Sequence, residues 1–424
     1  MSKKSKRKLC FILIVTLFLR LFWVLIVDTS PDLEGGDGPF YLHLGDQLAR
    51  GLGLTYGEPI AVVGPVYPLY LAFVQILFGV EDVILVARVG QAFMGVGFSL
   101  LMFDLGRRWV GTEVGLVAAG LIALDLRFIV ESGSISTETL LSFLLLINIW
   151  LYMLAIERNT RKWWVIFGVV LGITTLTRGV VQYLPVVFVF VMFFQRNRIN
   201  IWKSCLLFLT GFIMVVLPWV IRNWIIFGNP TIAHGGAAHF WMGAQGDGRS
   251  LRKYEMMDEI NDLRIGDGGA DRYRYVEDAF DIIMNDPVGF LSLRSVRLAE
   301  AYMQPFGTVS VGEVFGTTSI KNLVFDDSRS TLQEIFRQPS LLPKLWIYCF
   351  HFGSILASFF YMYKERHLVV VWMIFPIIIF YFTIVYSLLT IIPRYIFPVM
   401  SLYLLMSACV FRDLGKHIYS LLKN

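Results

Sequence analysis

Long apolar segments alternate with short polar ones along most of the chain. A run of about 20 apolar residues is long enough to cross a bilayer as a helix. The apolar run 162–195 is too long for one such helix, and the letters LTRG interrupt it, so we expect two short helices that meet near Arg178 and Gly179. Single spans are expected at 9–27, 83–105, 113–130, 138–156, 203–225, 341–363, 368–388 and 395–412. This pattern predicts an all-α polytopic membrane protein.

Composition supports this prediction. Of the 424 residues, 56% are hydrophobic and 16% are charged, whereas soluble domains carry about 25% charged residues. The net charge of +5 comes from short loops, where it indicates membrane orientation and not nucleic-acid binding. The four cysteines are widely spaced and form neither a zinc pattern nor a disulfide framework. No small-residue cleavage site follows the first apolar segment, so we expect it to be retained as a helix.

Basic clusters predict which loops face the cytoplasm. If every basic cluster faces the cytoplasm, the chain must cross the membrane twice between one cluster and the next. The apolar segments allow this everywhere except between the first two clusters, where there are three candidate segments. One of them, 65–79, is short and begins with Pro65 and Pro68, so we expect it to be re-entrant or to lie on the membrane surface. About ten spanning helices then remain, with both termini in the cytoplasm. The clusters are 3–8, 107–108, 158–162, 196–203, 364–367 and 412–423.

The same topology places several polar features outside the cytoplasm. They include the stretch from Glu131 to Glu138 and three arginines near helix ends, Arg178, Arg222 and Arg394. Charged residues in such positions are costly to bury and tend to line functional cavities. Each arginine alone also fits a side chain that snorkels to the interface. Arginine is usually enriched on the cytoplasmic side of a membrane protein. Three arginines on the outer side depart from this bias, and the departure favours a functional cavity.

The first outer loop carries acidic residues just before a helical pattern. Apolar residues recur at Phe40, Leu44 and Leu48, which predicts an amphipathic helix from about Pro39 to Leu48. Such a helix is one way to hold the preceding carboxylates at the bilayer surface. A solvated acidic loop is the alternative interpretation. The acidic residues are Asp32, Glu34 and Asp37.

Residues 228–340 form the largest polar segment, and we expect them to be an extracytoplasmic loop or cap. Helical patterns appear at about 270–304. His234 and His239 are five residues apart in a glycine-rich stretch without an evident third ligand, which favours a role other than metal binding. The expected division is a core at 1–227 with its first outer loop at 28–82, the cap at 228–340, C-terminal spans at 341–412 and a tail at 413–424.

An outward cavity with one carboxylate and several arginines suits transfer from a phosphate. Arginine binds phosphate through two parallel hydrogen bonds. A carboxylate can take the proton from an attacking hydroxyl or amine. Because no nucleotide-sugar pool exists outside the cell, a sugar donor there would be a lipid-linked phosphate that enters from the bilayer.

Six motifs in order resemble one superfamily. The chain resembles the GT-C glycosyltransferases that use polyprenyl-phosphate sugars, and it is similar to bacterial relatives of the protein O-mannosyltransferases and the lipid A aminoarabinose transferases. The resemblance covers nearly the whole chain, although each motif alone is weak. The motifs are GDGPFYLHLGDQLARGLGL, GPVYPLYLAFVQILFG, ISTETLLSFLLLINIWLY, GVVLGITTLTRG, LPWVIRNWIIFGNP and PRYIFPVMSLY.

The resemblance implies roles for particular residues. Asp37 corresponds to a catalytic base, Arg222 and Arg394 to contacts with the donor phosphate, and Arg178 to a further candidate. Gly38 stands where some relatives carry a second acid, so Glu34 is its candidate substitute. The loop lacks a D-x-D motif, so we expect no divalent metal and no other cofactor. Further candidates for the substrate cavity are Tyr41, Glu138, His234, His239 and Tyr395.

The expected function is therefore an inverting glycosyltransferase in a bacterial or archaeal cell membrane. Its donor would be a polyprenyl-phosphate sugar and its acceptor a glycan, lipid or protein outside the cytoplasm. A transporter or flippase of an anionic lipid-linked substrate is the first alternative, but it should show polar residues at both faces and internal repeats. A membrane scaffold is the second, and it would leave the outward arginines without a role.

Overall fold

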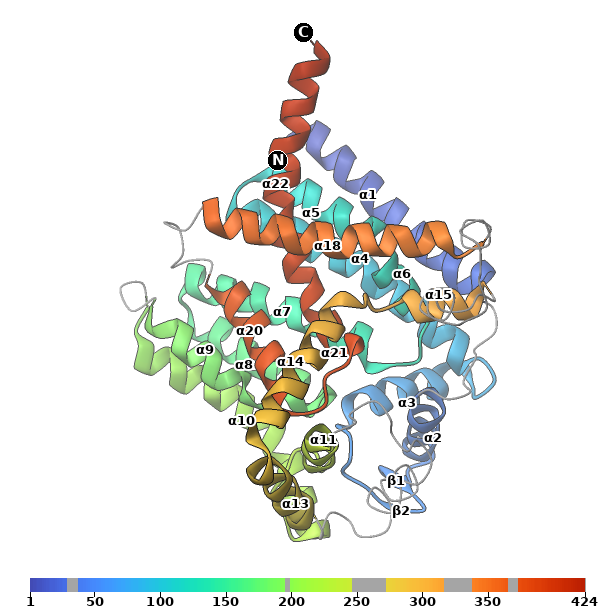
Figure 1. The fold of residues 1–424 in the computed structure, drawn as a ribbon, viewed down its shortest axis with the longest axis vertical. Coiled ribbons are helices and arrows are strands. Elements are labelled where there is room, and N and C mark those ends of the chain that lie inside the picture. Colours follow the sequence, from blue (N-terminus) through green and yellow to red (C-terminus); the bar gives the residue numbers. More distant parts are fainter. Residues whose placement is uncertain (29–36, 195–198, 246–271, 316–337, 365–372, 424) are drawn as a thin grey trace.

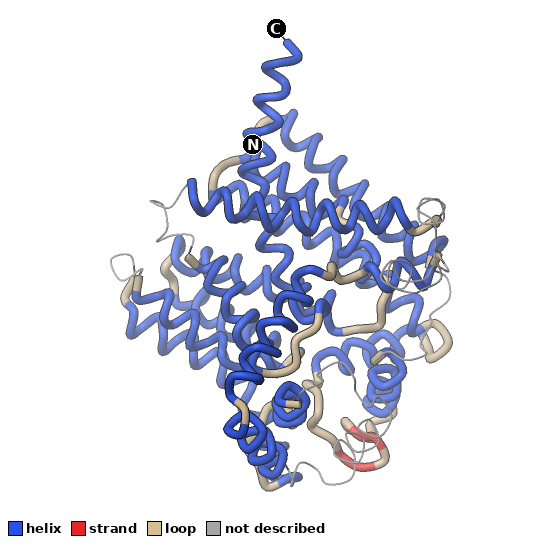
Figure 2. Tube along the Cα trace, in the orientation of Figure 1, coloured by secondary structure: helices blue, strands red, loops and turns tan. Residues whose placement is uncertain are grey.

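A computed structural model describes residues 1–28, 37–194, 199–245, 272–315, 338–364 and 373–423. Nearly all regular structure in these ranges is helical (Figures 1 and 2). One short antiparallel pair, β1 (Thr55–Tyr56) and β2 (Glu58–Pro59), turns at Gly57, whose φ of 76° suits glycine. The predicted all-α polytopic fold is confirmed.

The helices follow one another in a simple order. The N-terminal half contains α1 (Lys3–Phe22), the π-helix η1 (Trp23–Val27), α2 (Gly38–Ala49), α3 (Val66–Phe78), α4 (Val83–Trp109), α5 (Thr112–Leu124), α6 (Leu126–Glu131), α7 (Thr137–Arg158), α8 (Arg161–Thr177), η2 (Gly179–Tyr183) and α9 (Leu184–Phe193). The C-terminal half contains α10 (Ile201–Phe227), α11 (Gly235–Ala244), α13 (Arg272–Asn285), α14 (Pro287–Met303), α15 (Thr308–Val314), α18 (Leu341–Lys364), α20 (Ile374–Leu388), α21 (Pro393–Ile396), η4 (Phe397–Val399) and α22 (Met400–Lys423).

Six stretches among the described residues are long and apolar enough to cross a membrane. They are 3–27, 83–109, 137–158, 201–227, 341–364 and 393–418. Shorter apolar helices occupy 66–78, 112–124, 179–193 and 374–388. The protein is an integral membrane protein, while the total of ten spans and their orientation stay predictions. The start of the predicted span 368–388 lies outside the described residues.

Two of the predicted apolar segments, 162–195 and 113–130, are each divided into shorter helices. The expected break near Arg178 is confirmed, because α8 ends at Thr177 and a 3-10 turn begins at Gly179. The predicted span 113–130 was wrong as one helix, because it divides at Asp125 into α5 and α6. The Asp125 carboxylate caps α6 by accepting from the backbone N–H of Arg127 at 3.0 Å, which starts a new helix at that point.

Close backbone contacts at glycines fix the positions of α8, α10 and the segment around Gly64. A methyl group at Gly168 of α8 would lie 1.9 Å from the carbonyl oxygen of Phe208 in α10. Small residues at such interfaces let membrane helices approach closely. At the end of α8, a methyl group at Gly64 would lie 2.0 Å from the Leu176 carbonyl oxygen. The segment around Gly64 is thereby held against the end of α8.

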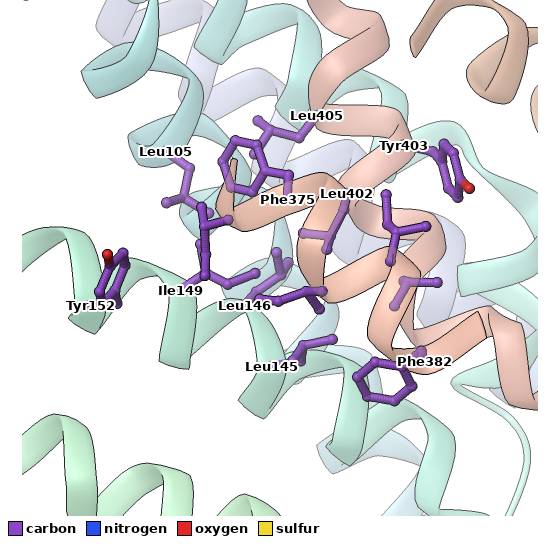
Figure 3. Close-up of a cluster of buried hydrophobic side chains, with 14 of the residues drawn as sticks. Leu105, Leu145, Leu146, Ile149, Tyr152, Phe375, Phe382, Leu402, Tyr403 and Leu405 are labelled. Atoms are coloured by element: carbon purple, nitrogen blue, oxygen red, sulfur yellow. The ribbon is translucent and has the colours of Figure 1, made fainter. Parts of the chain in front are cut away.

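The core lies between α4, α7, α20 and α22. Figure 3 shows side chains that interdigitate there, including Leu145, Ile149, Phe375, Phe382 and Leu402. In Figure 1 the C-terminal part of α22 extends beyond the other helices. The core thus anchors the first half of α22, which η4 joins to α21, the short helix that carries Arg394.

A buried polar link joins α6, α14 and α18. Arg127 is fully buried and pairs with Asp125 at 2.5 Å. It also donates to Nδ1 of His351 at 2.8 Å, and the other ring nitrogen of His351 lies 2.7 Å from the Tyr302 carbonyl oxygen. Since arginine only donates and a carbonyl only accepts, the imidazole must be neutral with its proton on Nε2. This link fixes α14 against the membrane bundle.

The first outer loop folds as expected. The predicted amphipathic helix is confirmed as α2, which packs against α3 with Leu44 fully buried. The short apolar segment 65–79 forms α3, and its outer face exposes Leu69, Phe73 and Ile76. Whether α3 is re-entrant or lies on the membrane surface stays a prediction, as does the division into core, cap and tail.

Candidate active site

Arg394 joins the two carboxylates of the site. It stands at the second position of α21, behind Pro393, where the chain turns from α20 towards α22. Its Nη1 lies 2.8 Å from Oδ2 of Asp37. Its Nε and Nη2 form a two-pronged pair with Glu138, in which Nη2 lies 2.9 Å from Oε2. Asp37 comes from the residue before α2 and Glu138 from the first turn of α7, so three distant segments meet at one guanidinium.

Glu138 is also bound by Arg178. The Nη1 of Arg178 lies 2.5 Å from Oε1 of Glu138 and 3.3 Å from the Thr137 hydroxyl. The position of Glu138 near the N-terminus of α7 also places its negative charge where the helix dipole stabilises it. Its side chain is fully buried, and both oxygens accept from arginine. Glu138 therefore orients the two arginines and does not present an oxygen to a substrate.

Besides its bond to Glu138, Arg178 contacts a stack of aromatic rings. Its guanidinium lies 4.7 Å from the centre of the Tyr395 ring. Tyr395 in turn stacks on Tyr386, with ring centres 4.6 Å apart and planes inclined by 19°. His239 meets Tyr395 edge-on at 6.1 Å. A cation over a tyrosine face is attracted to its π-electrons, so this stack fixes the orientation of Arg178.

A cavity of about 230 Å³ opens beside this cluster. Its lining includes Asp37, Tyr41, Arg178, Tyr386 and Tyr395, together with the segment 62–64 and both predicted histidines, His234 and His239. The Asp37 side chain is 46% exposed, in contrast to the buried Glu138. Asp37 is thus the carboxylate that a molecule in the cavity can reach.

Tyr41 presents a neutral phenol to this cavity. It is buried and meets the Tyr67 ring edge-on at 5.1 Å. Burial raises the pKa of the Tyr41 hydroxyl well above its usual value, and the nearby Asp37 charge raises it further. The hydroxyl therefore keeps its proton at neutral pH and can donate a hydrogen bond.

Glu131 is an acidic neighbour whose role the sequence did not assign. It is buried at the end of α6 and accepts a hydrogen bond from the Ser136 hydroxyl. Burial raises the pKa of the Glu131 carboxyl to about 8, and the Glu138 charge adds to this shift. Burial therefore favours the protonated, neutral form of Glu131. Only its proximity to Glu138 in the sequence could have pointed to it.

Arg222 lies apart from the Arg394 cluster. Its Nη1 donates to the Ile60 carbonyl oxygen at 2.9 Å, and its Nη2 lies 3.4 Å from that of Leu54. Its guanidinium also packs over the Trp219 ring at 4.8 Å. Arg222 thus holds the segment that carries the β1–β2 turn, directly before the cavity-lining residues 62–64. Its predicted contact with phosphate stays a prediction.

The remaining predictions for the site concern a second acid, a metal ion and two histidines. Glu34, the candidate second acid, lies outside the described residues. Within the described ranges, no group of three or more His, Cys, Asp and Glu side chains is placed to hold a metal ion. His234 and His239 both line the cavity, and His234 also donates its backbone N–H to the Ala61 carbonyl oxygen at 2.8 Å.

Comparisons with known proteins bear on this arrangement. Residues 62–224 match the family model described as dolichyl-phosphate-mannose-protein mannosyltransferase. The apo oligosaccharyltransferase of Archaeoglobus fulgidus superposes with a TM-score of 0.56 at 15% identity, over 100% of this chain and 52% of that one. The chain has the GT-C fold. The resemblance predicted from the six motifs is thereby confirmed.

The GT-C match has clear limits in extent. The chain spans about half the length of the archaeal protein, and the family match contains Glu138 and Arg178 but neither Asp37 nor Arg394. The archaeal oligosaccharyltransferase AglB from Archaeoglobus fulgidus, in complex with an inhibitory peptide and a dolichol-phosphate, gives a TM-score of 0.54 at 15% identity over 100% of this chain and 52% of that one. ArnT from Cupriavidus metallidurans, bound to undecaprenyl phosphate, gives 0.45 at 14% identity over 97% of this chain and 78% of that one. No protein of curated function matches the chain.

Proposed function

We propose that this protein is a membrane glycosyltransferase that moves a sugar from a polyprenyl-phosphate donor to an acceptor outside the cytoplasm. One observation carries the proposal: Asp37 is exposed to the cavity, while its ion-pair partner Arg394 is held from behind by the buried Glu138. A general base must be accessible and precisely positioned. The cluster meets both requirements, because Glu138 holds Arg394 in place and Asp37, paired with Arg394, stays exposed to the cavity.

Asp37 is the base in this proposal. The acceptor hydroxyl or amine gives its proton to the Asp37 carboxylate as it attacks the anomeric carbon of the sugar. The bond between that carbon and the phosphate oxygen breaks, and its electron pair stays on the phosphate. A single displacement of this kind inverts the configuration at the anomeric carbon. The leaving phosphate is already anionic, so it requires no metal ion and no second acid.

The arginines supply the phosphate contact. Arg178 has the better-placed free donors, because its Nε and Nη2 bond to no other described residue and its side chain lines the cavity. Arg394 uses three of its five N–H groups on the two carboxylates. A planar guanidinium suits a tetrahedral phosphate through paired hydrogen bonds. Arg178 is therefore the main contact with the donor phosphate in this proposal, and Arg394 is a second contact.

The comparisons support the class of donor. The matching family is described by dolichyl-phosphate-mannose, and the archaeal structure holds a dolichol-phosphate. Both are phosphates on a long polyprenyl chain, which fits an integral membrane protein with a polar cavity. We leave the acceptor as a glycan, lipid or protein, and we expect the cavity to face outward in a bacterial or archaeal cell membrane with both termini in the cytoplasm.

The test is cleavage of the bond between the sugar and the phosphate. Purified protein in liposomes is supplied with a series of polyprenyl-phosphate sugars labelled in the sugar, hexoses and pentoses, together with a membrane extract that contains acceptors. We expect label to leave the lipid phosphate and to appear on an acceptor, and Asp37→Asn protein to release much less. Donor that crosses the bilayer with its sugar still attached would instead establish the transporter alternative.

A further inference from the structure

The helix α14 exposes one face without any charge. After Pro287, which begins the helix, its exposed residues are Val288, Leu291, Ser292, Ser295, Val296, Ala299 and Met303. At 100° per residue these positions form a stripe about 140° wide, as wide as the apolar face of an amphipathic helix. Leu291 is 64% exposed and Val288 is 76% exposed. For a helix in the region expected to be a water-exposed cap, this surface is unusually apolar.

The charged residues of α14 all turn towards the protein. Arg294 is buried and donates to the Leu389 carbonyl oxygen at 2.8 Å. Arg297 pairs with Glu300 at 2.9 Å, and their side chains are only 14% and 31% exposed. Their inward orientation leaves the stripe apolar, although the sequence of α14 carries three charges. This is the reverse of a helix that rests on the surface of a soluble domain.

The helix α14 packs against α20, a helix that is expected in the membrane. The helices α14 and α20 are in contact, and Tyr302 bonds to the Thr383 hydroxyl at 2.6 Å. The apolar helix α20 exposes Phe380, Ile384 and Leu388 at helical spacing. In Figure 1, α14 and α20 are inclined to each other and come close towards the lower end of α20. The helix α14 therefore combines an uncharged exposed face with direct packing against an apolar helix that exposes a face of its own.

We propose that this face of α14 lies against the acyl chains of the bilayer, as an embedded amphipathic helix beside α20. Seven uncharged positions over about four turns suit insertion to the depth of the headgroup and acyl boundary. Arg294, Arg297 and Tyr302 each bond to a group inside the protein, namely the Leu389 carbonyl oxygen, the Glu300 carboxylate and the Thr383 hydroxyl, so insertion would expose none of these groups to lipid. Because Arg294 holds Leu389, which lines the cavity, the lipid-facing helix is attached directly to the cavity wall.

The experiment measures contact with lipid in the whole protein. The four native cysteines are replaced by alanine, and single cysteines are placed at Leu291, Val296, Phe380 or Asp281 and labelled with bimane. Phe380 is the control for a lipid-facing residue, and Asp281, exposed and charged on α13, is the control for water. The labelled proteins are reconstituted in phosphatidylcholine vesicles with and without brominated acyl chains. Each labelled variant is also checked for a parental unfolding temperature.

We expect the labels at Leu291 and Val296 to be quenched by brominated lipid as strongly as the label at Phe380, and several times more than the label at Asp281. The proposal fails if the Leu291 label is quenched no more than the Asp281 label. A second copy or another part of the chain over this face would also leave it unquenched, so that outcome overturns the proposal too. The result does not depend on whether the protein transfers a sugar.

Discussion

Changing a carboxylate to an amide should have different effects at the two carboxylates that Arg394 binds, Asp37 and Glu138. Asp37→Asn removes the exposed carboxylate, and Glu138→Gln removes the buried one, with nearly the same change in shape. If Asp37 is the base, the first substitution should affect the rate much more than the folded state. If Glu138 positions the arginines, the second should affect the stability first.

The structure sets the size of each effect. The pair between Asp37 and Arg394 is 2.8 Å long but the carboxylate is 46% exposed, and such pairs are worth about 0.2–1 kcal/mol. Loss of general base catalysis typically reduces the rate by about 10²–10⁴, or roughly 3–5 kcal/mol in the barrier. Glu138 is fully buried and pairs with two arginines. Breaking a buried pair costs about 3–5 kcal/mol, and we expect the lower end because both arginines keep some exposure.

The assay combines turnover with thermal unfolding on both purified variants. We expect Asp37→Asn to unfold within a few degrees of the parent and to bind the polyprenyl-phosphate sugar, yet to turn over about 10²–10⁴ times more slowly. Glu138→Gln should unfold several degrees lower. Product from the parent should show inverted anomeric configuration. Near-parental turnover by Asp37→Asn, or a product that retains the donor configuration, would refute the assignment of Asp37.

Three further predictions concern the phosphate, the metal and the topology. Arg178→Ala should weaken binding of polyprenyl-phosphate sugar more than Arg222→Ala, and Arg178→Lys should recover only part of it, because lysine lacks the planar fork; equal loss in titrations of the two alanine variants would restore Arg222 to the phosphate site. Turnover should be unchanged after EDTA, and a loss that Mg²⁺ or Mn²⁺ restores would contradict this. An impermeant maleimide added outside cells should label a cysteine at Gly248, which lies outside the described residues, and spare one at Arg161; the reverse pattern would overturn the predicted orientation.

The sequence predicted those parts of the fold that depend on segment length and periodicity. The helix α2, the break after Thr177 and the apolar helix α3 follow from apolar spacing and from interruptions such as LTRG. The division at Asp125 was missed because an apolar run does not show where a side chain caps a new helix. The carboxylate of Asp125 does this by accepting from the Arg127 N–H, an interaction between close neighbours that hydropathy does not register.

For the site, the sequence identified residues but not their orientation. Asp37, Arg178 and Arg394 were expected near one cavity, and the structure places them around Glu138. Arg222 sits in an equally persuasive motif, yet it contacts the backbone at Ile60, because the motif fixes its place along α10 and not the direction of its side chain. Tyr386 lies within an apolar run, so nothing in the pattern distinguishes it from a core residue. These features depend on how helices distant in sequence pack together.

The cluster around Glu138 also has a consequence for the order in which the protein is made. Arg178 follows Glu138 by 40 residues, whereas Arg394 follows it by 256. At about 5–20 residues per second, the ribosome would deliver the first partner within roughly 2–8 seconds and the second only after roughly 13–50 seconds. Glu138 can therefore enter the membrane paired with Arg178 alone. Asp37 can meet Arg394 only after α21 has been made, so we expect a nascent chain that stalls before α21 to be able to form the Glu138–Arg178 pair but not the Asp37–Arg394 pair.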